Sequence, residues 1–342
     1  KAQGDSMQGE ADASAAKPSL CVTAHMDHPG LVVIDYDSAT RTGTAAFRGG
    51  TQPSVFPGAP LRLYHEGSWI KAQAAGPLQQ TGPARFTDPT FTFRIARGRA
   101  AAGDVGTFDV PFASLKGSRL RTKSADDLAQ VALALGWLLR LAAERVDCRA
   151  IAIFTRAEEV GFIGASGLLE TDLLPEDDIP VIVLECSKEL PGVAEIGKGP
   201  VLRVGDAASV YDPAVDAWML RVATALRQAD AEALGVPVAP QGSGPQRATS
   251  APHPETVDSF TFQRALMTGG VCEAGLFTLH RPRVGAIAVP LGNYHNIDPT
   301  SASGVGPEEI SLSDCANELR LLERLVLEPF GEPAEGGIRG RI

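Results

Sequence analysis

The chain is poor in several features whose abundance would indicate a particular partner. Its 342 residues include 31 lysines and arginines against 41 aspartates and glutamates, which gives a formal net charge of −10. Nucleic-acid binding depends on clustered Lys and Arg that neutralise phosphates, so this balance argues against nucleic acid as the main partner. No apolar run reaches the roughly 20 residues that a membrane-spanning helix needs, which argues against a membrane partner.

Cysteine is also scarce, and its number is odd. The five cysteines show no paired spacing: Cys21, Cys148, Cys186, Cys272 and Cys315. This pattern favours free thiols in a reducing cytosol over a disulfide framework, so we expect a cytoplasmic protein. Residues 1–18 are small and polar and contain no apolar signal-peptide core.

The remaining sequence changes in character along its length, and this change predicts two domains. Residues 37–118 contain short β-prone runs separated by Gly, Pro and Asp, which is typical of a small all-β domain. From residue 119 apolar strands alternate with amphipathic helices, which predicts an α/β fold whose mostly parallel or mixed sheet lies between helix layers. We therefore expect a main domain formed by 1–36 and 119–342, with 37–118 inserted into it. The expected elements of the main domain are helices 124–144, 163–170, 212–231 and 307–328, strands 148–156 and 179–186, and a loop at 242–258.

The most informative stretch is IAIFTRAEEVGFIGASG, residues 151–167. An apolar run ends shortly before Glu158 and Glu159, and three glycines follow. The carboxyl ends of strands are where open α/β sheets place their chemistry. One carboxylate there can bind a metal while the other moves a proton. Most Glu-Glu pairs, however, are simply solvated surface residues, so this pair needs partners elsewhere in the chain.

Such partners follow other predicted strands. The strand SLCVTAH ends in His25, and Asp27 lies two residues on, on the same side of an extended chain, where it could orient the imidazole. IPVIVLE ends in Glu185, and VGAIAVPLGNYH ends in His295. Two further acids, Asp126 and Asp127, begin the helix at 124–144, where capping of that helix is the alternative interpretation.

These pieces occur in a characteristic order: AHMDHPG, SADDLAQV, AEEVGFIGASG, VIVLE, GKGP, GGVCEAG and LGNYHN. In this order the chain resembles the di-zinc aminopeptidase family of the tetrahedral aminopeptidases, glutamyl aminopeptidases and "cellulase M" proteins. The resemblance spans most of residues 19–325. It implies a zinc-peptidase-like α/β fold and two bound divalent metal ions, with zinc preferred over cobalt or manganese.

The resemblance also implies a role for each candidate residue. His25 and Glu185 would bind one metal, and Glu159 and His295 the other. Asp126 would bridge both metals through a carboxylate followed by a cis peptide bond to Asp127. Glu158 would be the general base and Asp27 would orient His25, so the catalytic residues would be Glu158 and Asp27.

Three positions depart from the family pattern: Glu185 and Glu273 replace aspartates, and Leu128 replaces an arginine. The family usually has a helix and strands before the His25 strand, so we expect an N-terminal part to be omitted or shortened here. In the family the inserted domain mediates assembly, which implies self-association through 37–118.

The sequence therefore predicts a metallo-aminopeptidase that hydrolyses N-terminal residues from peptides, using a bridging water on a two-metal centre. Two alternatives remain at this stage. The same residues could serve an amidohydrolase or deacylase acting on a small acylated molecule, or the chain could be a non-catalytic assembly protein.

Overall fold

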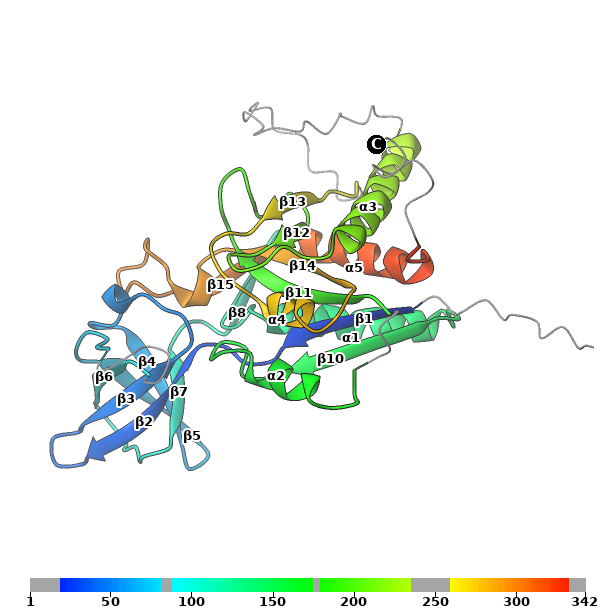
Figure 1. Cartoon of the computed structure of the whole chain (residues 1–342). Coiled ribbons are helices and arrows are strands. Elements are labelled where there is room, and N and C mark those ends of the chain that lie inside the picture. Colours follow the sequence, from blue (N-terminus) through cyan, green and yellow to red (C-terminus); the bar gives the residue numbers. More distant parts are fainter. Residues whose placement is uncertain (1–18, 81–87, 175–178, 235–258, 332–342) are drawn as a thin grey trace, which may run out of the picture.

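The computed structural model describes residues 19–80, 88–174, 179–234 and 259–331. A helix-flanked sheet forms the larger part of the protein, and a small β-barrel projects from one end of it (Figure 1). The architecture confirms the predicted α/β fold with a separate antiparallel β domain. The predicted loop at 242–258 and the polar residues 1–18 lie outside the described residues.

The main sheet has six strands in the order β10-β1-β11-β14-β12-β13. The first four strands are parallel, whereas β12 runs antiparallel to β14 and β13 runs parallel to β12. The sheet is therefore mixed. Its strands are β1 (Ser19–His25), β10 (Arg149–Thr155), β11 (Val181–Lys188), β12 (Val201–Gly205), β13 (Gln263–Leu266) and β14 (Val284–Leu291).

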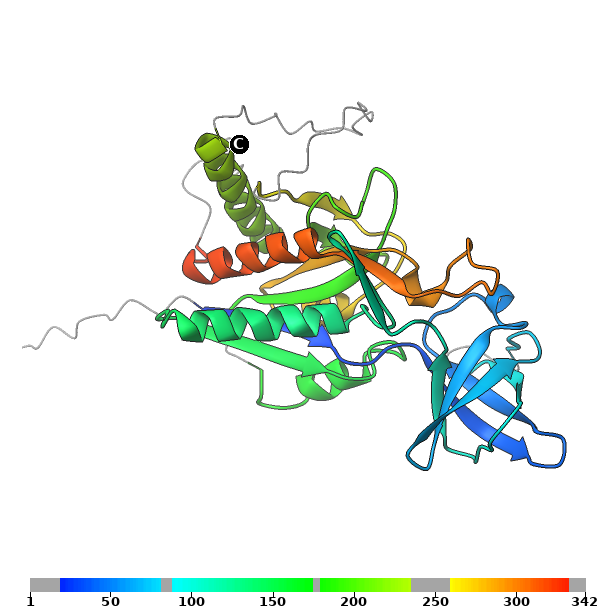
Figure 2. The ribbon, with the colours of Figure 1, turned by 180° about the vertical axis from the view of Figure 1, so that it is seen from behind.

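Helices cover both faces of this sheet, which explains why its central strands are apolar along their whole length. Every residue of β14 is buried, and so is nearly all of β11. The helices α1 (Leu128–Ala143), α3 (Pro213–Leu234) and α5 (Leu312–Leu327) pack on one face around Trp137 and Trp218 (Figure 2). The short helices α2 (Ile163–Leu169) and α4 (Glu273–Thr278) cover the other face around Phe277.

The barrel is closed by six strands in the order β2-β3-β6-β5-β4-β7, and phenylalanine side chains fill its interior. It extends from Gly30 to Phe108, whereas the sequence placed the boundaries of this domain at 37 and 118. The run GLVVIDYD is already its first strand, because Leu31 and Val33 face the barrel core. The strands are β2 (Gly30–Asp37), β3 (Thr42–Arg48), β4 (Pro60–His65), β5 (Ser68–Ala74), β6 (Thr90–Ile95) and β7 (Val105–Phe108), with a 3-10 turn η1 (Pro53–Val55).

A third, three-stranded sheet connects the two parts. It pairs β8 (Ala113–Lys116) with β9 (Arg119–Thr122), and β9 with β15 (Glu308–Ser311). The predicted helix at 307–328 is thus wrong in its first turn, because residues 308–311 pair with β9 and only then does α5 begin. The predicted helix at 124–144 likewise begins later, at Leu128. Both differences place acidic residues in the segments that precede the helices.

Candidate metal centre

The candidate residues come from five separate segments and meet where the parallel strands end. His25 is the last residue of β1, Glu185 lies near the end of β11, and Glu158 and Glu159 follow β10. Asp126 immediately precedes the start of α1, and His295 lies in the 3-10 turn η2 (Tyr294–Asn296) after β14. Parallel strands bring their carboxyl ends to one edge, which explains how residues so distant in sequence converge.

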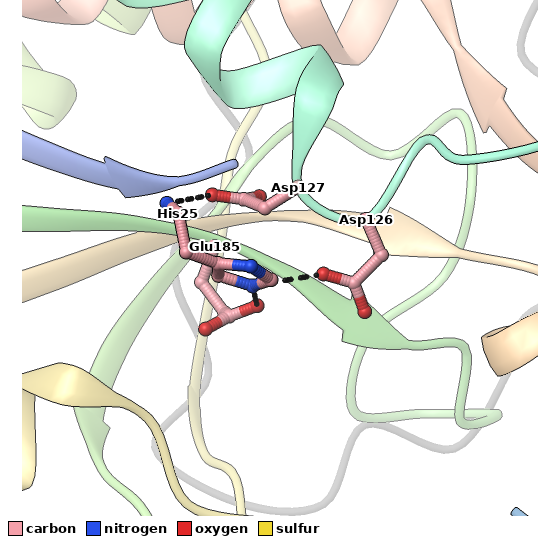
Figure 3. Close-up of side chains that lie close together, drawn as sticks. All are labelled: His25, Asp126, Asp127 and Glu185. Carbon is pink, nitrogen blue, oxygen red and sulfur yellow. Dashed lines mark hydrogen bonds and ion pairs between the residues drawn. The ribbon is translucent and has the colours of Figure 1, made fainter. Parts of the chain in front are cut away.

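The first group of ligand atoms surrounds His25. Its Nε2 lies 3.2 Å from Asp126 Oδ1 and 3.6 Å from Glu185 Oε1. Figure 3 shows the imidazole extending from the end of β1 toward these two carboxylates. All three side chains are buried. We call His25, Glu185 and the facing oxygen of Asp126 the first half-site.

The second group surrounds His295. Its Nε2 lies 3.6 Å from Asp126 Oδ2 and 3.1 Å from Glu159 Oε1. We call His295, Glu159 and the facing oxygen of Asp126 the second half-site. The two oxygens of Asp126 therefore point to different imidazoles, as a bridging carboxylate would.

Both imidazoles are oriented through their other nitrogen. His25 Nδ1 lies 3.1 Å from the main-chain oxygen of Asp27, and His295 Nδ1 lies 2.5 Å from the main-chain oxygen of Gly50. A carbonyl can only accept a hydrogen bond, so each Nδ1 carries the proton and donates. Each Nε2 is thereby turned toward the carboxylates with its lone pair free in the neutral ring, which is the usual arrangement for a metal-binding histidine.

Asp27 contacts His25 differently from the sequence prediction. Its Oδ1 is 3.8 Å from His25 Nδ1, and the carboxylate instead accepts main-chain N–H bonds, from Glu158 through Oδ1 at 3.0 Å and from Glu159 through Oδ2 at 3.2 Å. The prediction assumed an extended chain through residue 27, but β1 ends at His25. Asp27 therefore orients His25 with its carbonyl and holds the Glu158–Glu159 turn with its carboxylate.

Asp127, the residue after Asp126, contacts the main chain of His25. The Asp126–Asp127 peptide is cis, as the resemblance implied. Asp127 occupies the N-cap position of α1 but forms no side-chain capping hydrogen bond. Its Oδ2 accepts the main-chain N–H of His25 at 3.3 Å instead (Figure 3), so the capping interpretation does not explain this residue.

The charge distribution fits divalent cations. Asp126 Oδ1, Glu159 Oε1 and His295 Nε2 are buried and form no hydrogen bond within the described part of the chain. Ligand atoms of His25, Asp126 and Glu185 lie within 4.8 Å of one another, and so do those of Asp126, Glu159 and His295. Buried carboxylates without compensation are costly, and imidazole with carboxylate is a suitable ligand set for zinc. The residues therefore fit two neighbouring metals.

The pKa values of these groups are shifted by burial and by the charges of their neighbours. Burial raises the pKa of Glu158 to about 10, with Glu185 adding to the effect. Burial lowers the pKa of His295, but Asp126 and Glu159 more than reverse this and raise it to about 10. Burial raises the pKa of Asp126, yet His25 and His295 lower it below its usual range. Positive charge at the centre is thus strongly favoured.

One residue that supports the centre was missed by the sequence reasoning. Glu308 is fully buried and accepts main-chain N–H bonds from Ala125 at 2.7 Å, Asp126 at 3.0 Å and His295 at 3.0 Å. It thereby joins the bridging aspartate to the second half-site. The only sequence signal for Glu308 was its acidic side chain in GVGPEEISL. The predicted helix at 307–328 had assigned this residue to the first turn of a helix.

His28 supports the same region from the other side. Its Nδ1 lies 2.7 Å from the carbonyl of Asp126, and its Nε2 lies 3.1 Å from Asn296 Oδ1. Asn296 Nδ2 donates to the carbonyls of Lys123 and Gly306, so its oxygen is free to accept. Both nitrogens of His28 therefore face acceptor oxygens, so the ring links the Asp126 main chain to Asn296.

The other departures from the family pattern lie near this centre. Glu273 begins α4, is buried, and accepts a hydrogen bond from Thr155 Oγ1 at 2.9 Å. Leu128 begins α1 and is 45% exposed. Leu128 therefore lies at the surface next to Asp126 and Asp127. Glu273, by contrast, is a further buried carboxylate, bonded to Thr155 at the end of β10.

Comparison with known proteins supports the resemblance. The model of the M42 glutamyl aminopeptidase family matches residues 97–228. A TET aminopeptidase from the marine sediment archaeon Thaumarchaeota archaeon SCGC AB-539-E09 superposes with a TM-score of 0.67 at 18% identity, covering 91% of this chain and 81% of that chain. The Pyrococcus horikoshii TET1 peptidase, which can assemble into a tetrahedron or a large octahedral shell, gives 0.64 at 19% identity, covering 92% and 85%.

A third solved structure, an aminopeptidase from the archaeon Desulfurococcus kamchatkensis, gives a TM-score of 0.61 at 18% identity and covers 91% of this chain and 80% of that chain. No curated protein sequence matches the chain. The structural likeness establishes the fold, and the family match supports a peptidase, that is, a hydrolase. No helix in the described residues is long and apolar enough to cross a membrane.

Proposed function

We propose that this protein is a metal-dependent aminopeptidase that uses two divalent ions, with zinc favoured over cobalt and manganese. The proposal rests on the position of Asp126, whose two carboxylate oxygens face different imidazoles. Its Oδ1 lies 3.2 Å from His25 Nε2, and its Oδ2 lies 3.6 Å from His295 Nε2. His25 and Glu185 would hold one ion, and His295 and Glu159 the other. Asp126 would belong to both.

Two such ions would supply a nucleophile at neutral pH, by lowering the pKa of a shared water, and would polarise the scissile carbonyl. Proton transfer would be carried out by Glu158, which is not among the five proposed ligands. Its carboxylate would take a proton from the water and return it to the leaving amine. Asp27 keeps Glu158 in place by accepting its main-chain N–H at 3.0 Å.

The site should prefer a free N-terminal amine to an acylated one. Three ligand carboxylates (−3) and a hydroxide from the shared water (−1) would cancel the charge of two divalent ions (+4), and ionised Glu158 would then make the surroundings negative. Such a field favours an ammonium group. Glu273, buried close by, adds to this preference once it is ionised.

The test is a panel of aminoacyl-anilides with zinc, cobalt or manganese, together with one peptide and its N-acetylated twin. We expect hydrolysis of the free peptide and little of the acetylated one. Equal rates on the two peptides would instead support the amidohydrolase or deacylase alternative. Metal binding without any hydrolysis would favour the non-catalytic assembly protein.

The proposed base can be tested separately. Glu158→Gln keeps the shape of the side chain but cannot accept a proton, so turnover should fall by about 100-fold or more while bound metal is retained. Glu170→Gln is a matched control, because Glu170 is an exposed glutamate after α2. Near-normal turnover in Glu158→Gln would move the base to another residue.

We also propose that the protein self-associates through its barrel. Support comes from three apolar side chains on adjacent strands β5, β4 and β7, which are paired in register and about half exposed: Trp69, Tyr64 and Val105. We expect a dimer or a larger assembly built from dimers. The double variant Trp69→Ser/Tyr64→Ser should release monomers in light scattering, and an unchanged mass would refute the role of this face.

A cytoplasmic location completes the proposal. All five cysteines are free in the structure, and Cys21, Cys186 and Cys272 are buried. Free thiols of this kind persist in a reducing compartment. Fractionation of cells expressing the protein would test the location.

A further inference from the structure

A buried arginine near the candidate metal centre has a guanidinium nitrogen without a hydrogen-bond partner. Arg203 lies in the middle of β12 and is 3% exposed. Its Nε is fully buried and has no hydrogen-bond partner within the described part of the chain. By contrast, Arg264 on the neighbouring strand β13 is paired with Asp216.

Strand register places Arg203 on the same face of the sheet as Glu185. Arg203 is opposite Ala286 on β14, and Ala286 is opposite Val183 on β11. Side chains opposite one another share a face, and so do residues two apart on one strand. Arg203 therefore lies two strands from Glu185, a lateral distance of roughly 10 Å.

The polar groups around Arg203 are engaged with one another. Asp206 accepts hydrogen bonds from the main chain of Ala208 and Ser209 and from the hydroxyl of Tyr211 at 3.0 Å. Tyr211 Oη also lies 3.2 Å from Cys272 Sγ. These hydrogen bonds join the polar groups to one another and to the main chain, and none of them involves Arg203.

The pKa values of Arg203 and Glu185 agree with this placement. Burial lowers the pKa of Arg203, but Cys272 and Tyr211, followed by Glu185 and Asp206, more than reverse this effect and raise it. In turn, Arg203 lowers the pKa of Glu185 against the larger effect of burial. The guanidinium is thus held as a cation between α4 and the first half-site.

A buried cation without a partner is costly, and the guanidinium fork matches a carboxylate in shape and charge. We propose that Arg203 binds a carboxylate of the substrate and so determines which peptides are cleaved. This inference rests on the proposed peptidase function. The carboxylate has two possible sources, an acidic side chain of the N-terminal residue or the C-terminal carboxylate of a dipeptide.

The experiment compares the zinc-loaded full chain with its Arg203→Met variant on two matched pairs. Glutamyl- and glutaminyl-anilide differ only in the side-chain carboxylate, and Leu-Gly and Leu-Gly-amide differ only in the terminal carboxylate. In Arg203→Met we expect the kcat/KM ratio of charged to neutral partner to fall about 10-fold or more in one of the two pairs. The pair that responds identifies the source. Arg264→Met, on the neighbouring strand, should leave both ratios unchanged.

Thermal unfolding supplies a readout that does not depend on turnover. Replacing an unpaired buried charge by an apolar side chain of similar size is neutral or stabilising, so the Tm of Arg203→Met should not fall. Glutarate should raise the Tm of the wild type more than that of Arg203→Met, with uncharged glutaramide as the control. A lower Tm of Arg203→Met together with unchanged ratios would show a structural arginine and overturn the proposal.

The outcomes also separate this inference from the proposed function. If the wild type cleaves the neutral substrates but neither ratio changes in Arg203→Met, the carboxylate role is wrong and the peptidase stands. If the wild type cleaves none of the substrates, the peptidase proposal fails, and the glutarate difference alone then decides whether Arg203 is a carboxylate site.

Discussion

The two half-sites are built in different ways although their ligand types match. His25 is the last residue of β1 and Glu185 lies within β11, and the two strands are adjacent and parallel, so their pairing fixes both positions. His295 and Glu159 lie in loops beyond β14 and β10. The backbone around His295 is left-handed at three non-glycine residues, Asn293, His295 and Asn296, with φ between 53° and 62°.

This difference implies unequal preorganisation. A left-handed non-glycine residue costs about 1–3 kcal/mol unless its surroundings compensate. Around His295 the compensation comes from other parts of the molecule, namely Gly50 of the barrel and Glu308 of β15. We therefore expect the first half-site to bind metal more tightly, and the second to depend on contact between the barrel and the sheet.

The largest effect should follow from the residue that the half-sites share. Asp126→Asn removes a charge facing both imidazoles, so hydrolysis should fall by about 1,000-fold or more and bound metal should drop in both half-sites. Activity assays and elemental analysis measure the two effects. Asp172→Asn, at an exposed loop position, is the control. A variant with full metal content and activity would show that Asp126 does not bridge.

The next prediction separates the half-sites. After dialysis His295→Ala should keep about one metal equivalent with weaker binding of the other, whereas His25→Ala should lose the tighter ion. Calorimetric titration with zinc gives the stoichiometry and affinity of each variant. Equal losses in both variants would mean that the two positions fill as one unit, contrary to the ranking given above.

The first half-site was within reach of sequence reasoning. Apolar runs ending in His25 and Glu185 are visible as strands, and parallel strands must bring their ends together. The order of motifs then linked Asp126, Glu159 and His295 to them, and the structure places all five side chains in contact. Strand ends therefore carried most of the predictive information.

The supporting residues could not be read in the same way. Gly50 contributes only a main-chain oxygen, which any residue type has, so no sequence pattern marks it. Arg203 looks like an outward-facing residue in VLRVG, because strand alternation does not reveal that α4 covers that face. Glu308 was missed because its strand merges into α5 without a break in the sequence. Contacts of this kind depend on tertiary packing.

Glu308 offers a finer test of the second half-site. Glu308→Gln keeps one accepting oxygen but turns an NH2 group toward main-chain donors, so either the Asp126 side or the His295 side loses its partner. We expect zinc affinity of the second half-site to fall about 10-fold and stability to fall by about 1–3 kcal/mol. Glu309→Gln, the neighbouring residue that pairs with Arg119 and Arg121, is the matched control. Unchanged titration of the second ion would remove Glu308 from the description of the site.

The smallest effect on the metal centre is expected beneath the first half-site. Gln130 donates to the carbonyl of Glu185 at 2.8 Å and to the carboxylate of Glu318 at 3.1 Å. Burial raises the pKa of Glu318 to about 8 from 4.5. Because the folded state then holds a proton that the unfolded state releases, stability falls as pH rises from about 4.5 to about 8, by several kcal/mol at most.

Glu318→Gln removes this titration without removing the shape, so its unfolding free energy should change less with pH over that window, while zinc binding stays near that of the wild type. Denaturant unfolding at pH 5, 6, 7 and 8 measures the slope, and Glu144→Gln, an exposed glutamate after α1, controls for charge. An equally steep slope in Glu318→Gln would show that Glu318 is ionised in the folded protein. The support beneath the first half-site would then be an ionised carboxylate, and the expected advantage of that half-site in metal affinity would need a different cause.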